Sequence, residues 1–347
     1  MAKFKPWEYA GKNTICVQGE PTSNPKKITG TRLGAVLGLN KWKSEFGAWC
    51  EICRVAEEPF EGNKYTEAGI AIEPKLIEWC KENVSPYIYT PEEWFKSKTK
   101  LYDHFPSEPI FGGMWDGIIL DDVLGKGEPI GVIEGKTSSR PQDWVDGVPP
   151  TYAAQGLEYA QLLGVDRVFF PVRFMEPDEY DHPEKCECTS DNTHLYDIHV
   201  SDTDIEADLR RAELWHKKHV AGNVSPKFNE KRDKVFLDIL RKSEVKDTDL
   251  EELAKEVATI ETKIEKILSK SELTDLEKQL KKLKGKMKPA MVKLFGKNDT
   301  AITAYGWQMK KSSRSEVDKE ALRKDNLLDK YSKVSDTYRL SKEKTND

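Results

Sequence analysis

Apolar and polar residues between positions 112 and 155 follow the pattern of a two-stranded hairpin and a helix that comes after it. Residues 112–120 alternate with a period of two, which places Asp116 on one face of the first strand with three apolar side chains, those of Met114, Ile118 and Leu120. A Gly-rich turn leads to the second predicted strand, over residues 131–139. The pattern therefore puts an acidic residue on an otherwise apolar strand.

The second predicted strand carries two further charged residues. Glu134 and Lys136 share one of its faces, and the small Gly135 lies between them on the other face. Charged groups on such strands are costly to bury unless they are paired or bind a metal ion. Two carboxylates beside a lysine suit a hard cation such as Mg²⁺ that holds a phosphodiester. The alternative interpretation is that these residues are solvated or form structural ion pairs.

The chain before the hairpin is predicted to begin irregularly, over residues 1–27, and then to be helical. Thr29 or Thr31 is a suitable N-cap for the first helix. Glu73 falls beside the apolar stripe that we expect on the third helix, formed by Ile70, Leu76, Ile77 and Cys80. The first predicted helix is short and ends at Gly38, and the second and third cover residues 44–58 and 66–84.

The helix after the hairpin begins at Pro149–Pro150 and carries Tyr152, Gln155 and Tyr159 along one face. Two apolar strands and an amphipathic helix are predicted beyond it, over residues 166–174, 194–200 and 205–226. This order of elements predicts an α/β domain with a mixed sheet flanked by helices, which ends near residue 228.

The last third of the chain changes character and shows two heptad seams. The phase breaks between them, and Thr274 with Glu277 reads as a capping box, so we expect an antiparallel, coiled-coil-like helical hairpin. A short strand over residues 300–311 and a final helix over residues 316–334 are predicted after it. The seams consist of Leu250, Leu253, Val257, Ile260, Ile264 and Ile267, and of Leu273, Leu276, Leu280, Leu283 and Met287.

Composition indicates a highly charged protein of about two domains, with 347 residues of which 33% are charged and 37% hydrophobic. Residues 1–230 carry a net charge of -12 and the remainder +7, for a total of -5. An acidic first part cannot attract nucleic acid by its overall charge, so DNA contact there needs a local basic lining or bound metal ions. Neither a membrane span nor the hydrophobic segment of a signal peptide is evident, and we expect a cytoplasmic location.

Six cysteines are scattered along the chain, and reduced thiols are expected. The spacing of Cys50 and Cys53 is found in zinc and iron–sulfur sites, but no second pair with suitable spacing accompanies it. Cys186 and Cys188 are distant and separated by a single residue. The pattern favours packing of these side chains, and no iron–sulfur cluster is expected.

In their order and spacing, Glu73, Asp116, Glu134-x-Lys136 and Gln155 resemble the YqaJ-type viral recombinases. This is the family of phage lambda exonuclease, within the PD-(D/E)XK nuclease superfamily. The resemblance runs from about residue 29 to residue 226 and includes the segments MWDG, IEGK and YAAQGLEYAQLLG. It implies a restriction-endonuclease-like core with a mixed central sheet, followed here by the helical hairpin.

The resemblance also implies roles for these residues. Lys136 would orient the attacking water, and Gln155 would position the nucleophile or the phosphate. The metal, Mg²⁺ with Mn²⁺ as the alternative, would be held by Asp116, Glu134, the Gly135 carbonyl and Glu73. In the family, a hydroxyl at the start of the first helix and a basic residue upstream hold a DNA 5′ phosphate. The DNA-binding candidates are Thr31 for the hydroxyl, Lys26, Lys27 or Arg32 for the cation, and Arg140 and Tyr159 as further contacts.

The resulting hypothesis is a Mg²⁺-dependent exonuclease that degrades one strand of linear duplex DNA from its 5′ ends. A single-strand annealing protein would use the product in recombination, the enzyme would be a homo-oligomer such as a ring, and the gene would belong to a phage or prophage in a bacterial cytoplasm. Three alternatives remain: a restriction-like or nicking endonuclease, a DNA-binding module with a decayed site, and an iron–sulfur nuclease. The predicted domains are an exonuclease core over 1–228, a helical hairpin over 229–296 and a small strand–helix segment over 297–347.

Overall fold

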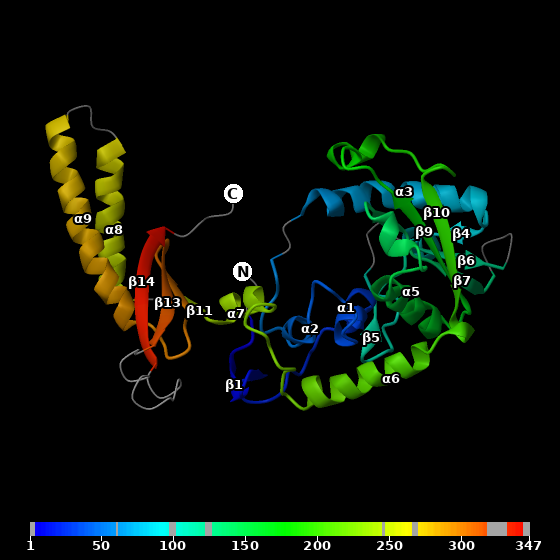
Figure 1. The fold of residues 1–347 in the computed structure, drawn as a ribbon, viewed down its shortest axis with the longest axis horizontal. Helices are drawn as coiled ribbons and strands as arrows, with labels where there is room; N and C mark the ends of the chain where they lie inside the picture. Colours follow the sequence, from blue (N-terminus) through cyan, green and yellow to red (C-terminus); the bar gives the residue numbers. More distant parts are fainter. Residues whose placement is uncertain are drawn as a thin grey trace. The chain divides into compact units, whose positions relative to one another are not determined.

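The computed structural model of the chain contains two compact units, Met1–Asp233 and Lys234–Asp347 (Figure 1). The described residues are 4–59, 62–96, 102–121, 127–244, 247–265, 270–317 and 332–342. Each unit has an apolar core of its own. None of the helices in the described ranges is both long enough and apolar enough to cross a membrane.

A six-stranded mixed sheet is the centre of the first unit. Its main path runs β10-β9-β7-β6-β4, and β8 pairs with β9 beside β7. β7 and β8 lie parallel to β9, and the remaining pairs are antiparallel. This confirms the predicted mixed sheet. The strands are β4 (Ile88–Tyr89), β6 (Gly117–Leu120), β7 (Pro129–Ile133), β8 (Lys136–Ser138), β9 (Arg167–Phe174) and β10 (Thr193–His199).

Two helices cover opposite faces of this sheet, α3 (Lys64–Asn83) and α5 (Pro150–Leu163) (Figure 1). The alternation of side chains along β9 shows this. Phe169 packs in a cluster with Ile77 of α3, whereas Val168 and Phe170 face α5. Gly156 makes that approach close, because a Cβ there would lie 2.6 Å from Val168 and 2.7 Å from Phe170.

The helices predicted from the sequence are present, but the buried face of α3 was predicted partly wrongly. Ile70 is 65% exposed, and Ile72 is buried in its place. Residues 68, 72, 76 and 80 form the buried row with a spacing of four, and a side chain two positions away from that row points to the other side of the helix. The other helices here are α1 (Gly30–Val36), α2 (Glu45–Ile52), α4 (Pro91–Phe95) and α6 (Ile205–Trp215), which continues as a π-helical turn over His216–Ala221.

Two short two-stranded sheets lie outside the main sheet, where the sequence predicted irregular chain or a longer strand. β1 (Trp7–Gly11) and β2 (Thr14–Val17) form an antiparallel hairpin within the first 27 residues. β3 (Ile28–Thr29) pairs in parallel with β5 (Phe111–Gly112). The strand predicted over 112–120 is therefore divided, and Gly113 between its parts has a φ of +127° that favours glycine.

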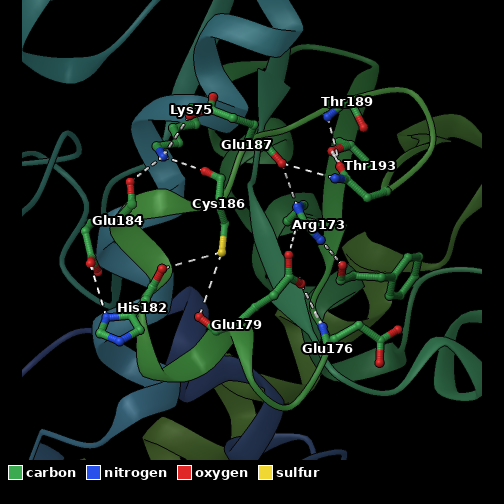
Figure 2. A network of polar contacts seen from close by, with 12 residues as sticks. Lys75, Arg173, Glu176, Glu179, His182, Glu184, Cys186, Glu187, Thr189 and Thr193 are labelled. Atoms are coloured by element: carbon green, nitrogen blue, oxygen red, sulfur yellow. Dashed lines mark hydrogen bonds and ion pairs between the residues drawn. The ribbon is translucent and has the colours of Figure 1, made fainter.

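A polar network fastens the segment after β9 to α3 and to the sheet (Figure 2). Lys75 of α3 donates hydrogen bonds to the backbone carbonyls of Glu184 (2.8 Å) and Cys186 (2.5 Å). Arg173 of β9 is only 3% exposed, and it forms an ion pair with Glu179 at 2.6 Å. Because Lys75 is two residues from Glu73, the network braces the part of α3 that carries this acidic residue.

The second unit combines the predicted helical hairpin with a small sheet. Its core unites Leu250 and Val257 of α8 with Met287 of α9 and Trp307 of β13. The predicted capping box is wrong: Thr274 lies inside α9, which begins at residue 270. The predicted last helix is replaced at both ends by β13 and β14, and its middle lies outside the described residues, as does Ile267. The elements are α7 (Lys234–Leu240), β11 (Lys242–Glu244), α8 (Thr248–Glu265), α9 (Lys270–Lys293), β12 (Ala301–Ala304), β13 (Trp307–Val317) and β14 (Ser332–Lys342).

Candidate active site

The candidate site lies at a break between β7 and β8. Glu134 and Gly135 occupy this break, after which the chain continues beside β9 with Lys136 opposite Val172. The backbone N–H of Glu134 donates to the carbonyl of Phe169 at 2.9 Å, and that of Gly135 donates to Oδ2 of Asp116 at 2.8 Å. Asp116 therefore lies against the break, directly before β6.

The carboxylate of Glu134 is the centre of a short hydrogen-bond network. Its Oε1 accepts from Nζ of Lys136 at 2.6 Å and from Nε2 of Gln155 at 2.5 Å. The residue is 1% exposed. Its other oxygen, Oε2, is buried and has no hydrogen-bond partner among the described residues. Such a group costs free energy unless a ligand satisfies it.

Electrostatic effects in the site oppose one another. Burial raises the pKa of Glu134, and the nearby charges of Asp116 and Glu73 raise it further, to about 8, although Lys136 acts in the opposite sense. Burial lowers the pKa of Lys136, but the carboxylates of Glu134 and Asp116 more than offset this and the net shift is upward. Lys136 is therefore a permanent cation at neutral pH, beside acids that repel one another.

α5 and the start of α1 form the wall opposite these acids. A Cβ at Gly30 would lie 2.5 Å from Cγ of Gln155 and 2.8 Å from the hydroxyl oxygen of Tyr159, so only glycine permits this approach. A Cβ at Gly113 would lie 2.7 Å from the same Tyr159 hydroxyl oxygen. Burial, then the negative charge of Glu134, raises the pKa of the Tyr159 phenol, which keeps its proton as a hydrogen-bond donor.

Asp116, Gln155 and Tyr159 border a cleft of about 550 Å³, which we call the acidic cleft, and the hydrogen bond from Gln155 links it to the buried Glu134. α3 contributes Glu73, the segment before β6 contributes Asp116, and α5 contributes Gln155 and Tyr159. The cleft thus brings together side chains that are up to 130 positions apart, from residue 29 to residue 159. Its further lining residues include Thr29, Thr31, Arg32, Thr90, Glu92, Tyr102 and Trp115.

The predicted DNA-binding residues are distributed over different places. Thr31 and Arg32 border the acidic cleft, and Tyr159 does so from α5. Lys26 forms an ion pair with Glu57, and Lys27 with Asp103, each at 2.7 Å, and neither borders the acidic cleft. Arg140 borders a different cleft, together with Trp144 and Tyr152. The structure therefore brings together only part of this set.

The side chains of the site are suited only in part to binding a hard cation such as Mg²⁺. Within the described ranges, no three His, Cys, Asp or Glu side chains are grouped closely enough to hold a metal ion. Two observations nevertheless fit a cation: the buried Oε2 of Glu134 without a partner, and the repulsion by Asp116 and Glu73 that raises the pKa of Glu134. A bound cation would relieve both, and carboxylate and carbonyl oxygens are the ligands that Mg²⁺ prefers.

Two residues near the site were not singled out by the sequence. Glu158 is completely buried, and burial raises the pKa of its carboxyl well above the ordinary value. Its position three residues after Gln155 on the same helix was a signal, since residues three apart share a helix face. Glu92 borders the acidic cleft from α4, whose capping box of Thr90 and Glu93 is visible in the sequence.

Comparison with known proteins gives a family match over the part of the chain that carries the site. The YqaJ-like viral recombinase domain matches residues 23–164, a segment that includes all five residues from Glu73 to Gln155 proposed for catalysis. Among relatives, the uncharacterised protein MG373 of Mycoplasma genitalium is 25% identical over 244 residues, which cover 59% of this chain and 84% of the relative. Its Mycoplasma pneumoniae homolog is also 25% identical, over 243 residues, 58% of this chain and 84% of the homolog.

Two solved structures are similar to part of the chain. One is an alkaline exonuclease of Laribacter hongkongensis, with a TM-score of 0.38 and 17% identity over 56% of this chain and 89% of the exonuclease. The other is a phage related exonuclease of Haemophilus somnus, with a TM-score of 0.36 and 16% identity over 57% of this chain and 96% of that protein.

Proposed function

Residues 23–164 form a YqaJ-like viral recombinase domain, and on this premise we propose that the protein is a metal-dependent deoxyribonuclease that degrades linear duplex DNA from its ends. The observation that carries the proposal is the buried Glu134 carboxylate, which Lys136 and Gln155 hold beside Asp116. Acidic oxygens next to a fixed ammonium group suit hydrolysis of a phosphodiester, in which negative charge accumulates on phosphate oxygens.

Mg²⁺, or Mn²⁺ as the alternative, would be held by Asp116, Glu134 and the Gly135 carbonyl, with Glu73 from α3 as a further ligand. When bound, such a metal lowers the pKa of a coordinated water and stabilises charge on the phosphate. An acidic cleft would otherwise repel DNA, so neutralisation of these carboxylates is also a condition for substrate binding.

The side chains around the acids have roles of their own. Lys136 is protonated, so it would donate hydrogen bonds to the attacking water or to a phosphate oxygen and would not act as a general base. Gln155 would hold Glu134 in position and orient the nucleophile or the phosphate. Tyr159 keeps its phenolic proton and would donate from the wall of the cleft. Thr31 and Arg32 are the remaining candidates for contact with a terminal phosphate.

The name of the family domain, a viral recombinase, supports a role in recombination and a phage or prophage origin. We propose that degradation proceeds from 5′ to 3′ and leaves a single strand for an annealing protein. A homo-oligomer, for example a ring around the product, would keep the enzyme on its substrate. These finer points depend on the resemblance of the sequence motifs.

The test uses linear duplex DNA labelled at one end, with and without a 5′ phosphate, in Mg²⁺ or in EDTA. We expect the label at 5′ ends to be released only with the metal, and covalently closed circular duplex to stay intact. Glu134→Gln should abolish release. Glu213→Gln is the matched control, because Glu213 is exposed on α6 and borders neither the break nor the cleft.

Each outcome has a separate meaning. Release from 3′ ends would overturn the polarity, and cleavage of circular duplex would indicate an endonuclease. Absence of any hydrolysis by a folded protein with Mg²⁺ or Mn²⁺ would overturn the enzyme itself and leave a DNA-binding module. Full activity in Glu134→Gln would show that the acidic cleft is not the catalytic site.

A further inference from the structure

A second cleft, larger than the acidic cleft at about 780 Å³, is bordered by Thr137 and Ser138, which follow Lys136 on β8. Tyr152 of α5 connects the two, because the Lys136 ammonium lies 5.5 Å from the centre of the Tyr152 ring and also contacts Glu134. We propose that this second cleft, which we call the aromatic cleft, binds the single-stranded DNA segment next to the scissile phosphate by stacking bases on Trp42 and Tyr65. This inference rests on the proposed function.

The lining of the aromatic cleft has the composition of a single-strand binding platform. Trp42 is 73% exposed and Tyr65 is 56% exposed, and both rings border this one cleft, where they are accessible to a ligand. Aromatic faces with cations nearby bind single strands with little sequence preference, since every base can stack. The polar lining residues are Lys41, Thr137, Ser138, Ser139, Arg140, Asp143 and Thr151.

Charge distinguishes the two clefts. The acidic cleft is bordered by Glu73, Glu92 and Asp116 and by one cation, Arg32. The aromatic cleft has Lys41 and Arg140 against a single acid, Asp143, whose carboxylate is 3.9 Å from the Arg140 guanidinium. A DNA backbone can therefore approach the aromatic cleft without a metal ion, whereas the acidic cleft requires one.

The Tyr65 ring and the backbone that carries Trp42 are held in position before any ligand binds. Tyr65 packs edge-on against Tyr180 with ring centres 4.9 Å apart. The Asn40 side chain accepts from the backbone N–H of Trp42 at 2.8 Å, and Thr151 donates to the carbonyl of Leu39 at 2.9 Å. These bonds tie the loop that carries Trp42 to α5. A rigid platform loses little conformational entropy on binding, which favours affinity.

The same elements border both clefts, so a strand can pass from one to the other. α3 contributes Tyr65 to the aromatic cleft and Glu73 to the acidic one, and α5 contributes Tyr152 and Gln155 respectively. Eight residues of helix span about 12 Å, which corresponds to roughly three to four stacked nucleotides at about 3.4 Å each. We therefore infer that the aromatic cleft is occupied by a short continuation of the DNA strand at the proposed catalytic site. An isolated small molecule would not extend from one cleft to the other.

The test measures binding of a short fluorescein-labelled oligothymidylate by anisotropy, in EDTA, so that hydrolysis does not contribute. We expect Trp42→Ala and Tyr65→Ala to raise the Kd by about 5- to 100-fold each, and Trp42→Phe to remain close to the unmodified protein. Arg140→Gln should lower the salt dependence of log Kd by about 0.7. Tyr9→Ala is the matched control, because Tyr9 is an exposed aromatic residue on β1 that borders neither cleft.

The proposal is overturned if the unmodified protein does not bind the oligonucleotide in EDTA, if Trp42→Ala and Tyr65→Ala bind as tightly as it does, or if Tyr9→Ala loses as much affinity. Its failure is distinguishable from failure of the proposed function. A protein that hydrolyses DNA with Mg²⁺ but shows none of these effects refutes only the aromatic cleft. A protein that binds as described but hydrolyses nothing with any metal refutes only the nuclease.

Discussion

Replacement of Glu134 by glutamine should stabilise the metal-free protein at neutral pH while it removes activity. The carboxyl has an ordinary pKa of 4.5 and a pKa of about 8 in the folded protein, because burial and the charges of Asp116 and Glu73 disfavour its ionised form. An acid whose pKa is raised by folding destabilises the protein as the pH rises above the unfolded value, since the unfolded chain releases the proton and the folded chain retains it. Glutamine has the same shape and does not ionise.

The size of the effect follows from the shift. Each pH unit between 4.5 and 7 contributes about 1.4 kcal/mol, which gives an upper value of about 3 kcal/mol at pH 7. Rearrangement of the hydrogen bonds that Lys136 and Gln155 donate to this side chain will reduce the gain. For a domain of this size we expect the thermal midpoint to rise by roughly 2–8 °C at pH 7 and to remain unchanged near pH 4.5.

The assay is thermal unfolding in EDTA from pH 4.5 to pH 8, followed by circular dichroism, for the unmodified protein, Glu134→Gln and the exposed control Glu213→Gln. Added Mg²⁺ should stabilise the unmodified protein and should have little effect on Glu134→Gln, because a ligand that binds only the folded state stabilises it. The explanation from the buried carboxylate would be refuted if Glu134→Gln raised the thermal midpoint equally at pH 4.5 and pH 8, or if it lowered the midpoint at pH 8.

Two further predictions concern packing and caps. Gly156→Ala should destabilise the first unit by about 1–3 kcal/mol, because the added methyl would meet Val168 and Phe170. Gly285→Ala in α9 has open space around the methyl and should stabilise by about 0.5–1 kcal/mol. Equal effects of the two substitutions in urea unfolding would contradict this contrast. Asn63→Ala should cost about 1 kcal/mol, since the Asn63 side chain caps α3 by accepting from two backbone N–H groups, and an unchanged unfolding midpoint would show that this cap contributes nothing.

Local patterns in the sequence are sufficient for the central part of the site. The period of two along a strand places Glu134 and Lys136 together, and their 2.6 Å contact confirms the shared face. The mixed sheet flanked by helices and the C-terminal hairpin are confirmed for the same reason: both depend on periodicity that extends over many residues. The catalytic roles assigned to the residues remain predictions.

The errors lie where tertiary contacts decide between equally good local patterns. Ile70 and Ile72 lie in one apolar run, and only packing against Met175, Tyr180 and Cys186 in the segment after β9 selects Ile72. Thr274 has the spacing of a helix start, but α9 is already helical there because its apolar face continues into the hairpin. The contact of Lys136 with Tyr152 joins a strand to a helix, and no spacing along the chain predicts it.

The break between β7 and β8 fixes the spacing between Glu134 and Lys136, so an insertion or deletion there would disrupt it. Glu134 and Gly135 lie between the end of the pairing with β6 and the pairing of β8 with β9. Both of their backbone N–H groups already donate hydrogen bonds, that of Glu134 to Phe169 and that of Gly135 to Asp116. One extra residue here would turn the ammonium group to the far side of the sheet, because neighbouring strand positions face opposite ways. Substitutions around the acidic cleft can adjust the proposed activity gradually, whereas an insertion of even one residue at this point would separate Glu134 from Lys136 in a single step.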